Sequence, residues 1–225
     1  MFQRILALSF FALCITRAWG QPSPEFVNVG FEAGLVAEGQ HHAVAIGDYD
    51  NDGDEDIYVG SKFAPNLLYR NDGNLTFTEV GVEAGVADEG FTNAAIWFDF
   101  DNDGDLDIGV THIGSPFALL ENNTQDPHHF LGLELVTESR IHPVGTRVEV
   151  TYDGETRVYC TSAGGSYLSD PDRRVLVGLG NHTGSVDVKI LWSTGDVTEL
   201  PDLAAQRYWR VSPDGPPLDL SQLAE

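Results

Sequence analysis

Short runs in which apolar residues alternate with polar ones recur along the first half of the chain, separated by glycine, proline and Asn-Asp-Gly. Alternation with a period of two is typical of half-buried β-strands, and no segment keeps a helical periodicity. The pattern therefore predicts a series of short strands. The first four are Ala43–Gly47, Asp56–Gly60, Asn66–Arg70 and Leu75–Val80.

This series repeats once along the chain. Residues 26–71 align without a gap with residues 77–122, and 21 of the 46 pairs are identical at an offset of 51. Four short antiparallel strands per repeat are typical of a propeller blade. We therefore predict two blade-like units, 26–76 and 77–122. A closed propeller needs at least about four blades, which leaves three alternatives: the two sheets pack on the rest of the chain, several chains complete a ring, or the protein is a shortened relative of longer ones.

From about Leu131 the pattern changes to strands without acidic loops. Two runs, Gly145–Tyr152 and Glu155–Thr161, flank Asp153-Gly154, which is a strong hairpin signal. Val186–Trp192 also alternates. The predicted fold is all-β: two propeller-blade-like antiparallel units that form an incomplete propeller, followed by a C-terminal β-sandwich or barrel-like domain at 131–212. Residues 123–130 are predicted as a linker and 213–225 as a loose tail.

The first twenty residues have the features of an export signal. A basic residue, Arg4, precedes the apolar run Ile5–Ile15, and small residues stand at 18 and 20. We place cleavage before Gln21. The apolar run is too short to span a bilayer, and no later run is long enough. The protein is therefore expected to be secreted, extracellular or periplasmic, without a transmembrane segment. Lipidation at Cys14 is disfavoured because the preceding Leu13 is bulky.

Removal of the signal leaves Cys160 as the single thiol, which excludes an intramolecular disulfide. Cys160 shares a face with Val158 in an alternating run. We therefore expect it to be a small residue of the core.

The charge of the chain excludes nucleic acids as partners. There are 35 acidic and 12 basic side chains, and the formal net charge is −23. Only two lysines, Lys62 and Lys189, are present. A nucleic-acid binder needs a basic face, so that class is excluded.

The acidic residues concentrate in two repeat-equivalent loops, Asp48–Asp56 and Asp99–Asp107. Each carries carboxylates at alternate positions and a glycine, Gly53 or Gly104, that permits a sharp turn. So many charges in one folded loop repel one another unless a cation neutralises them. Oxygen ligands with relaxed geometry favour calcium over zinc, copper or magnesium. We predict two Ca²⁺ sites whose candidate ligands are Asp48, Asp50, Asp52, Asp54 (through its carbonyl) and Asp56, and Asp99, Asp101, Asp103, Asp105 and Asp107.

An EF-hand begins with a similar acidic run but needs a bidentate Glu at position twelve and flanking helices. Here Val59 and Val110 occupy that position, and strands are predicted on both sides.

Recognised catalytic motifs are missing from the sequence. There is no Gly-x-Ser-x-Gly, His-Glu-x-x-His, phosphate-binding glycine loop or Cys-x-x-Cys. We therefore expect no enzymatic activity and no catalytic residues. Three tryptophans, Trp97, Trp192 and Trp209, are candidates for a sugar platform, although Trp97 and Trp192 lie in alternating apolar runs typical of core strands.

The Asp-x-Asp-x-Asp-Gly-Asp-x-Asp loops between strands resemble FG-GAP/VCBS repeats, the calcium-loop blades of integrin-type propellers. The second half resembles the ASPIC/UnbV domain of the cartilage acidic protein-like family. The matching segments are Val144–Val148, Ser162–Ser169, Val177–Gly180 and Leu191–Gly195. Family members usually carry more blades. The resemblance implies calcium-stabilised extracellular adhesion or recognition.

Three functions remain open from the sequence. The first is a secreted calcium-binding recognition or adhesion module whose partner is an extracellular protein or glycan and whose Ca²⁺ is structural. The second is a carbohydrate-binding or hydrolytic accessory protein that uses a metal loop. The third is a self-assembling propeller subunit, that is, a homo-oligomer.

Overall fold

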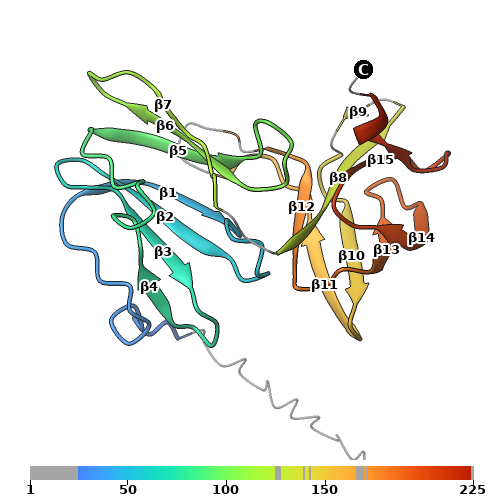
Figure 1. The fold of residues 1–225 in the computed structure, drawn as a ribbon, viewed down its shortest axis with the longest axis horizontal. Helices are drawn as coiled ribbons and strands as arrows, with labels where there is room; N and C mark the ends of the chain where they lie inside the picture. Colours follow the sequence, from blue (N-terminus) through green and yellow to red (C-terminus); the bar gives the residue numbers. More distant parts are fainter. Residues whose placement is uncertain are drawn as a thin grey trace, which may run out of the picture.

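The computed structural model describes residues 25–124, 128–138, 140–141, 143–165, 170 and 172–223. The described chain is built of short strands and one 3₁₀ helix, in two lobes (Figure 1). This confirms the predicted all-β class. The predicted export signal, residues 1–20, lies outside the described residues. Within the described part, no helix has the length and apolar character needed to cross a membrane.

The first blade-like unit forms a four-stranded antiparallel sheet in the order β1-β2-β3-β4, whose last strand lies beyond the predicted end of the unit at residue 76. All four predicted strands are present, with ends that differ by one or two residues. Their bounds are β1 His41–Gly47, β2 Asp56–Ser61, β3 Leu67–Asn71 and β4 Phe77–Glu79.

The second repeat forms only three strands, so the expectation of four strands per unit is wrong for this copy. They are β5 Thr92–Phe98, β6 Asp107–His112 and β7 Ala118–Leu120. The equivalent of β4 would be His128–Phe130. Strand β8, His129–Thr137, begins there instead and pairs in the second lobe, so the predicted linker also ends two residues early.

The two repeat sheets pack against each other around a shared core. In it, the rings of Tyr58 and Trp97 meet edge to face, with their centroids 6.2 Å apart. Small residues let the sheets approach closely. A Cβ at Gly60 would lie 2.4 Å from Cγ2 of Thr92 on the facing sheet. The buried residues of this core are Ala43, Ala45, Tyr58, Leu68, Val80, Ala95, Trp97, Ile108 and Val110.

The second lobe is a β-sandwich. One sheet has the order β11-β10-β13-β14, with β10 Arg147–Tyr152, β11 Glu155–Cys160, β13 Ser185–Leu191 and β14 Val197–Ala204. The other has the order β12-β8-β15-β16, with β9 on β8; its remaining strands are β9 Arg140–Ile141, β12 Val175–Gly180, β15 Tyr208–Val211 and β16 Leu218–Asp219. Strands β15 and β8 run parallel.

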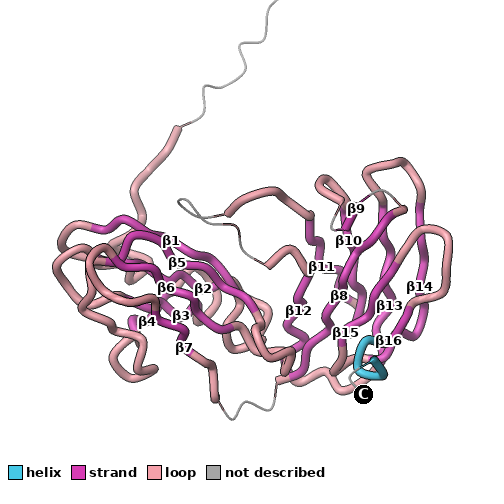
Figure 2. Tube along the Cα trace, turned by 90° about the horizontal axis from the view of Figure 1, so that it is seen from above, coloured by secondary structure: helices cyan, strands magenta, loops and turns pink. Residues whose placement is uncertain are grey.

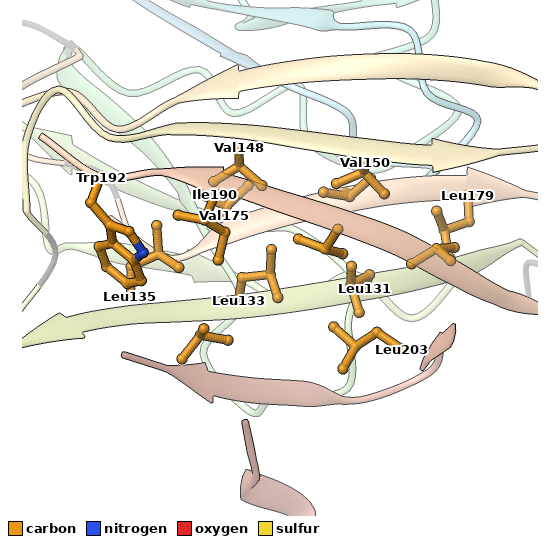
Figure 3. Packing of buried hydrophobic residues seen from close by; sticks show 14 residues of the cluster. Leu131, Leu133, Leu135, Val148, Val150, Val175, Leu179, Ile190, Trp192 and Leu203 are labelled. Atoms are coloured by element: carbon orange, nitrogen blue, oxygen red, sulfur yellow. The ribbon is translucent and has the colours of Figure 1, made fainter. Parts of the chain in front are cut away.

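The core of this sandwich lies between its two sheets (Figure 3). Leu131, Leu133 and Leu135 alternate along β8 and are at most 1% exposed, while Val148 and Val150 face them from β10. Burial of each such side chain favours the folded state by roughly 1.5–3 kcal/mol. The period-two pattern of the sequence thus directs one face of each strand inward.

Two expectations for this lobe are wrong. Cys160 is exposed. It shares a face of β11 with Val158, which is 47% exposed, and this face points away from the core, whereas Tyr159 on the other face packs against the core. The tail is structured at its described end: β16 pairs with β15, a 3₁₀ helix spans Leu220–Leu223, and the buried Asp219 accepts a 2.8 Å bond from Arg207.

The two lobes meet at the β1–β2 and β5–β6 loops of the first lobe and strands β11, β12 and β15 of the second (Figures 1 and 2). Each lobe keeps its own hydrophobic core. Among the described residues, the core of the first lobe stops at Val110 and that of the second begins at Leu131. The junction therefore lies outside both cores and combines loop residues of the first lobe with polar and apolar residues of the second.

Candidate metal centre

The two acidic loops occupy equivalent places in the repeat. Residues 48–55 join β1 to β2, and residues 99–106 join β5 to β6. Each loop turns through an asparagine and a glycine with positive φ: 56° at Asn51 and 92° at Gly53, 66° at Asn102 and 98° at Gly104. Asparagine and glycine tolerate this left-handed region better than other residues. The Asn-Asp-Gly segments therefore set the shape of both loops.

Hydrogen bonds inside the first loop fold its carboxylates inward. Oδ2 of Asp48 accepts from the amide of Gly53 at 2.9 Å, which closes the turn. Asp56, at the start of β2, accepts from the amides of Tyr49 (3.0 Å) and Asn71 (2.7 Å), one on each oxygen. Asp56 therefore ties the loop to the neighbouring strand β3.

The second loop repeats these bonds. Asp99 accepts from the amide of Gly104 at 2.9 Å, and Asp107 accepts from Phe100 at 3.0 Å and from Asn122 at 2.8 Å. The repeat seen in the sequence thus extends to individual hydrogen bonds.

The structure brings together the side chains of six of the ten predicted ligand residues. In each loop, three carboxylates offer one oxygen apiece within 4.8 Å of one another: Asp48, Asp50 and Asp52, and Asp99, Asp101 and Asp107. Calcium–oxygen distances of about 2.3–2.6 Å allow two ligands of one ion to be up to about 5 Å apart. Both triads therefore fit a calcium ion.

The other four predicted residues lie outside these two groups of carboxylates. Both carboxylate oxygens of Asp56 accept from backbone amides. Oδ1 of Asp103 accepts from the amide of Asp105, and Oδ1 of Asp105 accepts from the side chain of Asn51. The side chain of Asp54 is exposed and lies outside the triad, and a contribution of its carbonyl stays a prediction.

Electrostatics in the first loop favour a cation. Burial, reinforced by Asp52 and Asp50, raises the pKa of Asp48 to about 8, and burial raises that of Asp56 to about 7. In addition, Oδ1 of Asp48 is buried without a hydrogen-bond partner. A buried acceptor with no partner is costly. A divalent ion at the triad would provide that partner and compensate the charge.

Burial also raises the pKa values of Asp103 and Asp107 in the second loop. Both loops thus hold acidic groups in surroundings that disfavour their charged forms unless a cation is near.

Asn51 links the two loops, and the sequence reasoning missed it. Its side chain is 2% exposed and donates to the carbonyl of Gly104 at 3.1 Å and to Oδ1 of Asp105 at 2.9 Å. The Asn shared by both repeats at 51 and 102 was the available signal. The cross-loop bonds were not readable from it, because each copy looks self-contained.

The second lobe also contacts the loops. Tyr208 donates from its hydroxyl to Oδ2 of Asp99 at 2.6 Å, and Arg174 donates to the Asp99 carbonyl at 2.6 Å. The amide of Gly180 donates to the Asn51 carbonyl at 2.9 Å. These partners lie 75 to 129 residues apart along the chain, too far for a local motif to reveal.

Each half of the chain contains a segment that matches a known protein family. Residues 48–110 match the FG-GAP-like repeat family, and residues 137–216 match the ASPIC and UnbV family. Cartilage acidic protein 1 of Xenopus tropicalis is 28% identical over 130 residues, and the mouse and human proteins of that name are 27% identical over the same length. These matches cover 57% of this chain and 20% of each relative, so the chain spans about a fifth of their length. The chain thus contains one segment that matches the FG-GAP-like repeat family and one that matches the ASPIC and UnbV family, and it is similar to cartilage acidic protein 1.

Proposed function

We propose that this protein is an extracellular, calcium-binding recognition module without enzymatic activity, whose two Asp-rich loops hold Ca²⁺ in a structural role. The observation that carries the proposal is the pair of carboxylate triads, one of which includes the buried, unpartnered Oδ1 of Asp48. The FG-GAP-like match and the similarity to cartilage acidic protein 1 support an extracellular setting. The partner would be an extracellular protein or glycan.

In this function the ion would be held by Asp48, Asp50 and Asp52 in the first loop and by Asp99, Asp101 and Asp107 in the second. A bound calcium would neutralise the mutual repulsion of these carboxylates and so stabilise the folded loops. The backbone bonds to Asp48 and Asp99 close the turns. Calcium would hold this turned conformation against the repulsion between the carboxylates.

Thermal melting tests the structural role. Replacing Asp50 and Asp101 together by Ala should lower the melting temperature in millimolar calcium and leave it almost unchanged in chelator. The matched control is Asp214→Ala, because Asp214 is an exposed acid outside both loops. Equal destabilisation of the double variant with and without calcium would count against the proposal.

A glycan platform on the tryptophans has less support. Trp97 and Trp192 are 5% and 3% exposed, and each packs in a core. Neither ring is therefore available to stack on a sugar at the surface.

A second candidate function, self-assembly into a blade stack, has a specific observation in its favour. Leu68 is 1% exposed where it packs in the core between the two repeat sheets, but its repeat equivalent Leu119 is 44% exposed. Likewise Trp97 is 5% exposed, and its equivalent Ile46 is 63% exposed. The outer face of each sheet thus carries the equivalents of residues buried between the sheets. A second copy of this chain could pack there head to tail.

Sedimentation velocity tests this candidate. The wild-type chain should associate with rising concentration, Leu119→Glu should abolish association, and Val197→Glu, a change at a 55% exposed valine of the second lobe, should leave it intact. A wild-type chain that stays monomeric throughout would rule out self-assembly.

A further inference from the structure

The second lobe hydrogen-bonds to a carboxylate that would itself bind the ion, that of Asp99. Asp99 belongs to the second carboxylate triad, is 2% exposed, and accepts from both the Tyr208 hydroxyl and the Gly104 amide on Oδ2. Groups that hydrogen-bond a metal ligand orient it and tune its affinity for the ion. Tyr208 is therefore placed to position a calcium ligand from the other lobe.

Arg174 adds a second contact at the same loop. Its guanidinium donates to the Asp99 carbonyl at 2.6 Å and to the side chain of Asn102, and it lies 4.5 Å from the centre of the Tyr208 ring. Arg174, directly before β12, and Tyr208, the first residue of β15, thus contact the backbone turn as well as the carboxylate. Both contacts are made to the turned conformation of the loop.

The first loop is contacted in the same way. A Cβ at Gly53 would lie 1.4 Å from Nη1 of Arg157, and one at Gly178 would lie 2.1 Å from Oδ2 of Asp48. The imidazole of His128 donates to the carbonyl of Asp50 at 2.7 Å. At Gly178 the backbone of Asn51 would also lie 2.8 Å from the added Cβ, so this glycine is needed for the lobes to approach this closely, whereas the Arg157 guanidinium at Gly53 is the end of a flexible side chain.

The hydrogen bonds between the lobes depend on the conformation of the loops, because the loops supply the groups on one side of each bond. The two hydrophobic cores are separate, and a cavity of about 210 Å³ between the lobes is lined by polar residues such as Asp99 and Arg174 and by apolar ones such as Trp97 and Leu176. Domains that share no common core can move relative to each other. If the loops loosen, the lobes lose most of their direct bonds.

We infer that the ASPIC and UnbV lobe is a calcium-dependent clamp: Tyr208 and Arg174 bind the calcium-ordered form of the second loop, so calcium binding and docking of the lobes stabilise each other. The inference rests on the proposed calcium binding and extends it, since coupling between two sites is reciprocal. Weakening the docking contact must weaken calcium binding, and removal of calcium must release the lobe.

Calorimetric titration with calcium tests the first half of this coupling. Tyr208→Phe removes only the hydroxyl that donates to Asp99 and should weaken binding about tenfold at one of two sites, leaving the other unchanged. The control, Tyr69→Phe, removes the hydroxyl of another buried tyrosine, one without a hydrogen-bond partner. It should leave both affinities unchanged. A merely structural role of Tyr208 would lower thermal stability without this selective loss.

Small-angle X-ray scattering of the full chain tests the second half. The radius of gyration should be larger in chelator than in calcium, and Arg174→Gln should need more calcium to reach the compact form. If the wild type binds calcium but shows the same radius with and without it, or if Tyr208→Phe leaves both affinities unchanged, the clamp is wrong and the proposed function stands. A wild-type chain that binds no calcium overturns both.

Discussion

The hydroxyl of Tyr208 donates a 2.6 Å hydrogen bond to Oδ2 of Asp99, 109 residues earlier in the chain. This bond joins the two lobes at a carboxylate that also belongs to a candidate metal triad. The acidic loops therefore have two roles in this structure: they gather oxygen ligands, and they form the surface on which the second lobe docks.

Close approach at Gly178 gives a first prediction. Gly178 has an ordinary φ, but an added Cβ would meet Oδ2 of Asp48 at 2.1 Å and the backbone of Asn51 at 2.8 Å. Gly178→Ala should therefore push the lobes apart and increase the radius of gyration in calcium. Gly215→Ala is the matched control, because its nearest atom would be 3.4 Å away. A variant as compact as the wild type would show that the junction tolerates the methyl group.

The cross-loop bonds of Asn51 give a second prediction. Asn51→Gly keeps the positive φ of 56° accessible while removing one buried and one part-buried hydrogen bond, so the loss beyond the entropic cost of the added glycine reports on the side chain. We expect a loss of about 1–3 kcal/mol in the free energy of unfolding, measured by urea denaturation in calcium.

The control for this change is Asn74→Gly, since Asn74 has a φ of 51° in an exposed turn. It should cost much less. Equal losses for the two variants would mean that the Asn51 bonds contribute little.

The raised pKa values give a third prediction, on pH. The pKa of Asp48 is raised from its ordinary value of 3.8 to about 8 and that of Asp56 to about 7, both mainly by burial. Without metal, the folded state therefore favours the protonated forms. Their contribution to stability is fully present below pH 3.8 and is lost as the pH rises through about 7 to 8.

Calcium should compensate this loss, because it binds the charged carboxylates. The rise in melting temperature on adding calcium should therefore be larger at pH 9 than at pH 6. The Asp50→Ala, Asp101→Ala double variant should show little rise at either pH. A wild-type rise that does not change with pH would contradict the electrostatic account.

Ion size gives a fourth prediction. Each triad spans oxygens up to 4.8 Å apart, which suits the longer bonds and relaxed geometry of calcium better than the tight octahedron of magnesium. Millimolar magnesium should therefore raise the melting temperature less than the same concentration of calcium. An equal rise with both ions would indicate general charge screening rather than a site.

The sequence predicted those parts of the fold that depend on local pattern. Alternation located the strands of the first repeat, and the 51-residue offset located both acidic loops. Alternation also placed Val158 and Cys160 on one face of a strand, but it could not tell which face is buried, since that depends on the strand's neighbours. The absence of a fourth strand in the second repeat has the same cause: residues 129–130 pair with β12 in the other lobe.

The docking of the second lobe could not be predicted. Tyr208 and Arg174 carry no motif, and their contacts with Asp99 join residues 109 and 75 positions apart. Only the packing of the folded lobes brings them together. Asn51 lay within a recognised motif, yet its bonds to Gly104 and Asp105 also required the two repeat sheets to be packed side by side.

The central claim is that the two Asp-rich loops bind calcium, and calorimetric titration of the wild-type chain with calcium tests it most directly. The account predicts two ions per chain, with dissociation constants of roughly 10⁻⁴ to 10⁻³ M, and loss of both sites when Asp50 and Asp101 are replaced together. A titration without heat up to millimolar calcium, accompanied by no change in melting temperature, would contradict it.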